Sequence, residues 1–336
     1  MSTYSISDIA RICGVSKATI SRVINDKSDG VGEDTKLRIK KVIQELNYRP
    51  NMLARSVATS RSGLVGLIIP DVSNLFYPKI IRGVSNYLEL HDYSLILCNS
   101  DYDSDKERAQ LLSMVDKRVD GVILCSGVCN EEFLSEYKEY HIPLVSIGRI
   151  FDNYLCDASI SGDNIQGSLM EVRYLVKGGN KRIVYLDGNA GVSGAAQRFE
   201  GYRKGLEEAN LDYLPELVHF GDFSIEYGMS MTRKLLEDKV EFTAIMTGSD
   251  LIAIGVIKEL HHAGLRVPED IDVMGFDDIE LSQIFEPQLS TMAKPHYDMA
   301  TTATRMLISL INGTMGEMRH LTVEPRLILR STTKKY

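Results

Sequence analysis

Apolar residues in the first fifty positions recur every three or four residues, which is the spacing of short amphipathic helices. The pattern predicts one helix over 5–12, opened by the Ser-x-x-Asp spacing of a capping box. A second helix is predicted over 16–25 after the turn residue Gly14, and a third over 33–46 with Leu37 among its buried positions. Two short helices joined by a glycine-containing turn are typical of a helix-turn-helix unit.

The polar face of the second predicted helix carries side chains that can reach base edges or phosphates. They are Lys17, Thr19, Ser21, Arg22 and Asn25. A solvated face on a small helical bundle has the same pattern, so the residues alone leave DNA binding and simple solvent exposure both open.

From residue 64 onward, short apolar runs alternate with amphipathic helical stretches. The predicted strands are 64–69, 94–98, 121–124, 144–147, 183–186, 243–246, 271–275 and 327–330. Alternation of strands and helices indicates parallel sheets with right-handed crossovers, and the length of this region indicates two of them. The predicted fold class is therefore α/β, with an N-terminal all-α helix-turn-helix domain.

Ligands of open parallel sheets bind outside the carboxyl ends of the strands, so the loops there are expected to carry a binding site. Their aromatic and polar side chains suit a sugar or a heterocycle, because apolar faces stack while hydroxyls need donors and acceptors. The candidate residues are Asn74, Phe76, Tyr77, Ser126, Arg149, Arg198, Phe223, Ser249, Asp250 and Asp277.

Composition describes a soluble globular chain of two or three domains: 336 residues, 44% hydrophobic and 25% charged. The net charge of −8 argues at first against nucleic acid as a partner. Residues 1–62, however, carry eleven Lys and Arg against six Asp and Glu, a charge of +5. The remainder, with 27 bases and 40 acids, carries −13. A basic module attached to an acidic body restores the nucleic-acid hypothesis.

Other classes of protein lack supporting motifs. The five cysteines are scattered, which predicts reduced thiols, and no metal site is expected from the pair Cys125 and Cys129. The glycine-rich segment 188–194 lacks the lysine of a phosphate-binding loop, and the sequence has no nucleophile elbow, HExxH motif or paired-cysteine site. We therefore expect neither catalytic residues nor a cofactor. No apolar run is long enough for a leader or a membrane span, which predicts a cytoplasmic protein.

Several motifs closely resemble the lactose-repressor (LacI/GalR) family of bacterial transcription regulators. They are GVSKATISRVIN at 14–25, LNYRPN at 46–51, LARS at 53–56, GLIIPDVSN at 66–74, KRVDGVI at 117–123 and GFDD at 275–278. The resemblance implies a helix-turn-helix domain at 1–49, a hinge helix and linker at 50–62, and an effector-binding and dimerisation core at 63–336. It further implies that this core has two Rossmann-like lobes of the periplasmic-binding-protein type. The implied N-lobe is about 63–161 and 292–322, and the C-lobe about 162–291 and 323–336.

The resemblance also implies roles for residues at the DNA. Lys17, Ala18 and Arg22 take the positions that read bases, and Arg22 can bridge guanine O6 and N7. Phosphate contacts are expected from Ser16, Thr19, Ser21 and Asn25. The hinge helix is expected to place Leu53, Ala54, Arg55 and Val57 in the minor groove. Val57 stands where the family usually has a leucine that wedges between base pairs, and valine is shorter and β-branched.

In the core, the resemblance implies that Arg198 and Asp277 clamp a small sugar, a sugar phosphate or a similar metabolite. Phe76, Tyr77 and Phe223 take its aromatic or apolar positions. The expected protein is a homodimeric repressor of carbohydrate or related catabolic genes. It would bind a pseudo-palindromic operator under allosteric control by the effector. No leucine-heptad tail follows the last predicted strand, which favours a dimer over a tetramer.

An alternative partner stays open. Tyr297 and Asp298, together with Arg305 on the following helix, resemble the patch by which catabolite-control regulators of the family bind a phosphorylated carrier protein. Ala300 and Thr301 interrupt that pattern, and an ordinary family helix explains it equally well. A non-regulatory sugar-binding protein is the other alternative, but the basic module at 1–62 argues against it.

Overall fold

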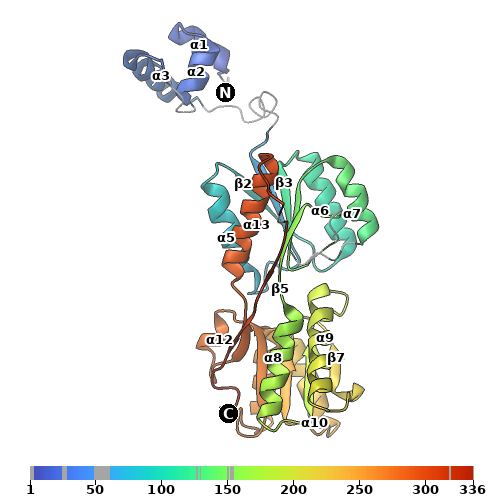
Figure 1. Cartoon of the computed structure of the whole chain (residues 1–336). Helices are drawn as coiled ribbons and strands as arrows, with labels where there is room; N and C mark the ends of the chain where they lie inside the picture. The colour runs from blue at the N-terminus through green and yellow to red at the C-terminus, as the bar shows by residue number, and fades with distance from the viewer. Residues whose placement is uncertain are drawn as a thin grey trace. The chain divides into compact units, whose positions relative to one another are not determined.

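The computed structural model describes residues 4–24, 29–48, 61–125, 128, 130–149, 151, 155–317 and 319–335. The chain divides into a small unit, Met1–Gly63, and a larger unit, Leu64–Tyr336 (Figure 1). The described part of the small unit forms α1 (Ile6–Cys13), α2 (Lys17–Ile24) and α3 (Glu33–Glu45).

The ends of α1 explain why the helix-turn-helix forms where the sequence predicts it. Ser5 N donates to the Asp8 carboxylate at 3.0 Å, and Asp8 N donates to the Ser5 hydroxyl at 3.3 Å, which completes a capping box. Gly14 ends the helix at φ 61°, a left-handed conformation that glycine adopts at little cost.

A small core holds the three helices together. Its buried residues are Ile9, Ala10, Cys13, Ile20, Val23 and Ile39. The expectation that Leu37 is buried is wrong, because this side chain is 65% exposed. Two positions separate Leu37 from Ile39, which is more than half a helical turn, so only one of them can face the core.

The larger unit contains helices and strands in alternation. Its helices are α5 (Tyr77–Glu89), α6 (Ser104–Asp116), α7 (Glu131–Tyr137), α8 (Asn164–Lys177), α9 (Ser193–Glu208), α10 (Ile225–Glu237), α11 (Asp250–His262), α12 (Leu281–Ile284) and α13 (His296–Ile311), with short 3-10 turns at Lys138–Tyr140 and Pro215–Leu217. Its strands are β1 (Leu64–Ile69), β2 (Ser94–Asn99), β3 (Gly121–Cys125), β4 (Leu144–Ile147), β5 (Ala158–Gly162), β6 (Ile183–Asp187), β7 (Val218–Phe220), β8 (Ala244–Thr247), β9 (Asp272–Asp277), β10 (Ser290–Ala293), β11 (His320–Val323) and β12 (Arg326–Ile328).

These strands form two six-stranded sheets, one in each lobe. The N-lobe sheet has the order β11-β5-β4-β3-β1-β2, and the C-lobe sheet has the order β12-β10-β9-β8-β6-β7. All neighbours are parallel except β10 and β12, which are antiparallel. The predicted α/β fold with two parallel sheets is confirmed.

The chain passes between the lobes after β5, after β10 and after β11. The N-lobe boundary expected at 292 is two residues too early. Met292 and Ala293 belong to the C-lobe sheet, since they pair with Phe276 and Asp277 of β9. Lys294 and Pro295 therefore form the second passage, which leads into α13.

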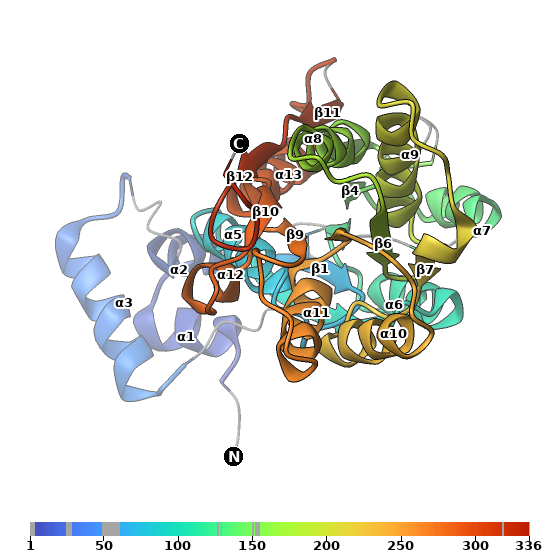
Figure 2. The same ribbon diagram turned by 90° about the horizontal axis from the view of Figure 1, so that it is seen from below.

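Helices cover both faces of each sheet. In the N-lobe, α5 and α13 pack on one face, and α6 and α7 on the other. In the C-lobe, α8 and α9 pack on one face, and α10 and α11 on the other (Figure 2). Of the described helices, none is long and apolar enough to cross a membrane.

Candidate functional site

One face of α2 carries the residues expected to read DNA. Lys17, Ala18 and Arg22 are exposed, while Ile20 and Val23 are buried on the opposite side. Ala18 and Arg22 lie four residues apart and therefore share a face, with Lys17 beside them. The packing of the small unit thus presents this face to the outside.

The residues expected at phosphates differ in their surroundings. Ser16 is exposed and caps α2, since its hydroxyl accepts a hydrogen bond from Thr19 N at 3.1 Å. The two hydroxyls of Ser16 and Thr19 are 2.9 Å apart. Ser21 is partly buried. Asn25 and the hinge positions Leu53, Ala54, Arg55 and Val57 lie outside the described residues.

A cavity of about 70 Å³ lies between the two lobes of the larger unit. Among the residues expected to form a ligand site, seven line it: Asn74, Phe76, Tyr77, Arg198, Phe223, Ser249 and Asp277. Six of them lie at or after the carboxyl ends of strands in both sheets, and Arg198 lies on α9, so both lobes contribute walls to the cavity.

Aromatic rings close the cavity across the lobes. Tyr102, which follows β2, lies with its ring centroid 5.6 Å from that of Phe223 in the C-lobe. The Tyr102 hydroxyl is 3.3 Å from the Tyr77 hydroxyl. Burial raises the pKa of Tyr102 to about 12, so this phenol stays protonated at neutral pH and can donate to a ligand.

Arg198 is the principal cation of the C-lobe wall. Its Nε donates to Asp187 Oδ2 at 3.0 Å and its Nη2 donates to Asp187 Oδ1 at 2.8 Å, a bidentate pair. Burial disfavours the charged form of Arg198, but the Asp187 carboxylate outweighs this effect and the pKa of the guanidinium is raised. Asp187 ends β6 and also accepts from Tyr185 and from Gly188 N.

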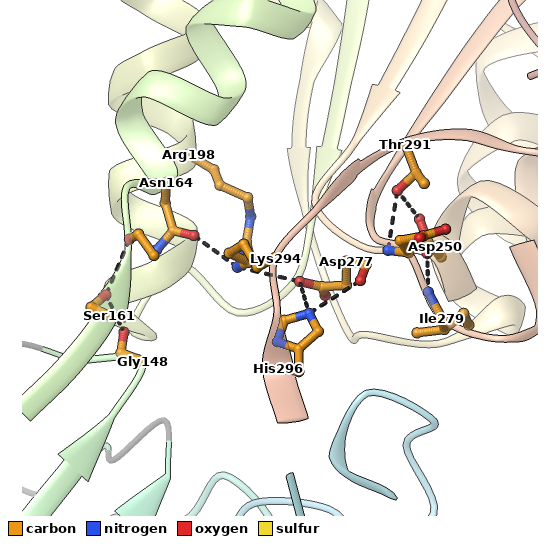
Figure 3. A network of polar contacts seen from close by, with 12 residues as sticks. Gly148, Ser161, Asn164, Arg198, Asp250, Asp277, Ile279, Thr291, Lys294 and His296 are labelled. Carbon is orange, nitrogen blue, oxygen red and sulfur yellow. Dashed lines mark hydrogen bonds and ion pairs between the residues drawn. The ribbon is translucent and has the colours of Figure 1, made fainter. Parts of the chain in front are cut away.

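A second polar group lies where the chain passes between the lobes (Figure 3). Lys294 Nζ donates to Asn164 Oδ1 at 3.0 Å and forms an ion pair with Asp277 Oδ1 at 3.3 Å. His296 Nε2 is 3.1 Å from the Asp277 carbonyl oxygen. Burial lowers the pKa of His296 to about 4, so the imidazole is neutral at pH 7. Burial also lowers the pKa of Lys294, although Asp277 opposes that shift.

Two of the expected ligand residues that the structure describes, Arg149 and Asp250, do not line this cavity. Arg149 is not among the lining residues, and its guanidinium lies 4.2 Å from the ring centroid of Phe151. Asp250 is buried away from the cavity, where it accepts from Ile279 N at 2.8 Å, from the Ser282 hydroxyl at 2.6 Å and from the Thr291 hydroxyl at 2.5 Å. Ser126 lies outside the described residues.

Asp250 therefore holds α11 to the segment after β9 and to β10 through its hydrogen bonds. Burial raises its pKa to about 7, although its hydrogen bonds oppose that shift. The expectation that it contacts a ligand came from its place next to Ser249, directly after β8. At the first turn of a helix, adjacent side chains point in different directions, and only Ser249 reaches the cavity.

The lining residues that sequence reasoning missed include Tyr102, Asn164, Lys294 and His296, whose polar groups can bind a ligand. Asn164, Lys294 and His296 lie at the first and second passages between the lobes. A site between two lobes includes the segments that join them, so the passages expected near 161 and 292 could have identified these residues. The residue types alone could not have done so.

The patch considered for a protein partner lies on α13. Tyr297, Asp298 and Arg305 are all exposed. The Tyr297 hydroxyl accepts a hydrogen bond from Asn86 Nδ2 of α5 at 3.2 Å. Tyr297 and Arg305 lie eight residues apart and share a helix face.

An outward-facing helix-turn-helix in one unit, and a cavity between two sheet lobes in the other, define a DNA-binding regulator with a ligand-binding core. Comparisons with known proteins agree. Residues 5–51 match "Bacterial regulatory proteins, lacI family", and residues 172–333 match "Periplasmic binding protein-like domain".

Relatives extend over nearly the whole chain. It is 38% identical over 331 residues to the HTH-type transcriptional regulator RegA of Clostridium saccharobutylicum, covering 98% of this chain and 99% of that protein. It is 35% identical over 331 residues to Catabolite control protein A of Priestia megaterium, with the same coverage of 98% and 99%. The solved lac repressor dimer, bound to operator and the anti-inducer ONPF, has the same fold, with a TM-score of 0.88 at 24% identity over 99% of both chains.

The chain therefore belongs to the LacI family of bacterial transcriptional regulators. It is a DNA-binding regulator with a helix-turn-helix domain and a periplasmic-binding-protein-like core. Its named relatives are regulators of transcription, not enzymes.

Proposed function

We propose that the protein is a homodimeric repressor of carbohydrate or related catabolic genes. In this role it binds a pseudo-palindromic operator in the bacterial cytoplasm. The observation that carries the DNA-binding part is the exposed face of Lys17, Ala18 and Arg22 on α2. Lys17 and Arg22 suit purine edges, and the Ala18 methyl suits thymine. Ser16, Thr19, Ser21 and Asn25 would contact phosphates, and the hinge residues 53–57 the minor groove.

Exposed apolar side chains on the core support the homodimer. Leu97 lies on the edge strand β2 and is 40% exposed, Leu90 is 81% exposed and Ile284 is 68% exposed. An edge strand with an exposed leucine is a surface that proteins normally cover. A two-fold dimer would place two reading helices on half-sites of opposite orientation, which requires a palindromic operator.

Selection of bound DNA from a random pool tests this part of the proposal. The expected result is an enriched sequence with two inverted half-sites, and Arg22→Ala should relax one base position in each half. Enrichment of a single half-site, or no enrichment, would contradict the proposed dimeric operator recognition.

The cavity is the proposed effector site, and a hydroxyl-rich neutral sugar suits it better than a sugar phosphate. Both buried cations of its wall already have carboxylate partners: Arg198 has Asp187, and Lys294 has Asp277. A phosphate would have to replace a carboxylate, whereas sugar hydroxyls can donate to carboxylates and accept from cations without breaking the pairs. The aromatic rings would stack on the C–H faces of the sugar.

Ligand binding can act on DNA only if it distinguishes two arrangements of the lobes. The cavity has walls from both lobes, so a bound sugar favours the closed arrangement and thereby changes the spacing of the two hinge segments in the dimer. Thermal-shift measurements with free pentoses, hexoses and disaccharides, and with their phosphate esters, test the site. A melting temperature that rises with a free sugar, but not in Arg198→Met, is the expected result.

A second candidate function is control by a phosphorylated carrier protein. The specific observation is that Tyr297, Asp298 and Arg305 are exposed together on α13 beside α5. A relative at 35% identity is a catabolite control protein. Arg305 would pair with the phosphoryl group. Calorimetry with a carrier protein in its phosphorylated and unmodified forms tests it, and equal heats for both forms would exclude a phosphate-dependent contact.

A further inference from the structure

The turn that follows β9 has an unfavourable backbone conformation. Asp277 has φ 112° and Asp278 has φ 52°, and both are residues with a Cβ atom in the region that favours glycine. Such conformations persist only where the surrounding structure holds them, and they are concentrated at functional sites. Asp277 also lines the cavity, so this turn is part of the wall that would meet a ligand.

Two side chains from the N-lobe side hold the backbone of this turn. Lys79 Nζ, on α5, donates to the Asp278 carbonyl oxygen at 3.1 Å. His296 Nε2, on the first residue of α13, is 3.1 Å from the Asp277 carbonyl oxygen. A carbonyl can only accept, so Nε2 carries the proton of this imidazole.

The two helices that supply these contacts form one packed pair. Ile80 and Val84 of α5 share a buried cluster with Met299, Ala300 and Ala303 of α13. A Cβ atom added at Gly83 would lie 2.7 Å from the Tyr297 carbonyl oxygen, which shows how closely the backbones approach. Lys79 and His296 therefore connect the C-lobe turn to a closely packed pair of helices of the N-lobe.

The remaining contacts of the turn come from the C-lobe or from the second passage. Arg330 Nη2 donates to Asp278 Oδ1 at 2.6 Å, and Asp278 N donates to the Thr291 hydroxyl at 3.4 Å. Lys294 forms an ion pair with the Asp277 carboxylate at 3.3 Å. Among the described residues, Lys79 thus makes the contact with this turn that comes from the body of the N-lobe and not from a passage between the lobes.

We infer that Lys79 is a positioning residue: its hydrogen bond to the Asp278 carbonyl holds the turn, and with it the Asp277 carboxylate, in place against the N-lobe. The importance of this contact for effector response rests on the proposed function of the cavity. When the lobes part, Lys79 must leave the carbonyl and the turn loses one of the groups that maintain its conformation. Closure of the lobes thereby also fixes the position of the Asp277 carboxylate that lines the cavity.

Hydrogen exchange on the full chain, without any sugar, tests this inference. The reporting amides are Asp278 N and Ile279 N, and the latter donates to the buried carboxylate of Asp250. Lys79→Met keeps the length of the side chain and removes the donor, and we expect exchange at 278–280 to become about tenfold faster. Lys79→Arg keeps a charged donor and should restore most of the protection.

The control is Arg82→Met, which removes an exposed cation from the same helix. It should leave exchange at 278–280 unchanged. A merely local role of Lys79 in α5 would speed exchange at 80–84 and leave 278–280 as in the wild type. That outcome, or equal effects of Lys79→Met and Arg82→Met, would overturn the inference. The sugar panel tests the proposed function separately, because the exchange experiment needs no ligand.

Discussion

Substitution of Glu171 by glutamine is expected to stabilise the protein, by an amount that increases with pH. Glu171 lies on α8 and is fully buried, and neither of its carboxyl oxygens has a hydrogen-bond partner in the described structure. Removal from water raises the pKa of this carboxyl well above its ordinary value, while Arg198 opposes the shift and three nearby aspartates reinforce it.

The direction of the pH effect follows from the raised pKa. Above the ordinary value of 4.5 the unfolded chain releases the proton of Glu171, whereas the folded chain keeps it. Folding therefore loses about 1.4 kcal/mol per pH unit between the unfolded and the folded pKa. Below the unfolded pKa both states hold the proton and the penalty disappears. Glu171→Gln retains the size of the side chain and removes the titration.

Urea unfolding of the wild type and of Glu171→Gln measures the difference in free energy of unfolding. Between about pH 5 and about pH 7 the advantage of the variant should grow by up to about 2.7 kcal/mol. Groups that titrate equally in both proteins cancel in this difference. A difference that stays constant across the pH range would refute the reasoning.

The matched control is Glu107, which is also fully buried but whose carboxylate oxygens accept from Val128 N at 3.0 and 3.1 Å. Glu107→Gln weakens a charged hydrogen bond and should destabilise the protein by about 1 kcal/mol or more. The opposite signs expected at two equally buried glutamates separate the effect of hydrogen-bond partners from the effect of burial.

Three further predictions concern the two sites and the core. Arg22→Ala should weaken binding to the selected operator by about 1–3 kcal/mol while leaving thermal stability unchanged, as a gel-shift titration against the control Arg11→Ala will show. Arg198→Met should lower the free energy of unfolding by about 3–5 kcal/mol, since it leaves the buried carboxylate of Asp187 without its cation; an unchanged urea midpoint would contradict the pairing. Gly255→Ala should cost about 1–3 kcal/mol, because its Cβ atom would lie 2.1 Å from the Ile225 carbonyl oxygen, whereas Gly316→Ala meets nothing within 4 Å and should be neutral in the same unfolding assay.

Local sequence signals predicted the elements that depend on neighbouring residues. The capping box at Ser5 and the left-handed turn at Gly14 are satisfied within a few positions of the chain, so their pattern was sufficient to place α1 and α2. The apolar strands β1 and β4 lie within the predicted ranges for the same reason, since their hydrophobic runs are continuous.

Strands with hydroxyl side chains were missed. β5 and β10 contain serine and threonine at buried positions, which resemble loop residues in a sequence. The Ser159 hydroxyl is 2.8 Å from His320 Nδ1, and the Thr291 hydroxyl donates to Asp250 at 2.5 Å. Partners more than forty positions away make these strands possible, and no local pattern shows them.

By itself, the sequence determined the two classes of unit, the family and the exposed face of α2. Only the tertiary structure decided that Lys294 and His296 belong to the cavity, and that Asp250 does not. The physical reason is that helix and strand patterns depend on short-range spacing. The state of a buried charge depends on which distant groups surround it: Asp277 meets Lys294 at the passage between the lobes, whereas Glu171 has no hydrogen-bond partner among the described residues.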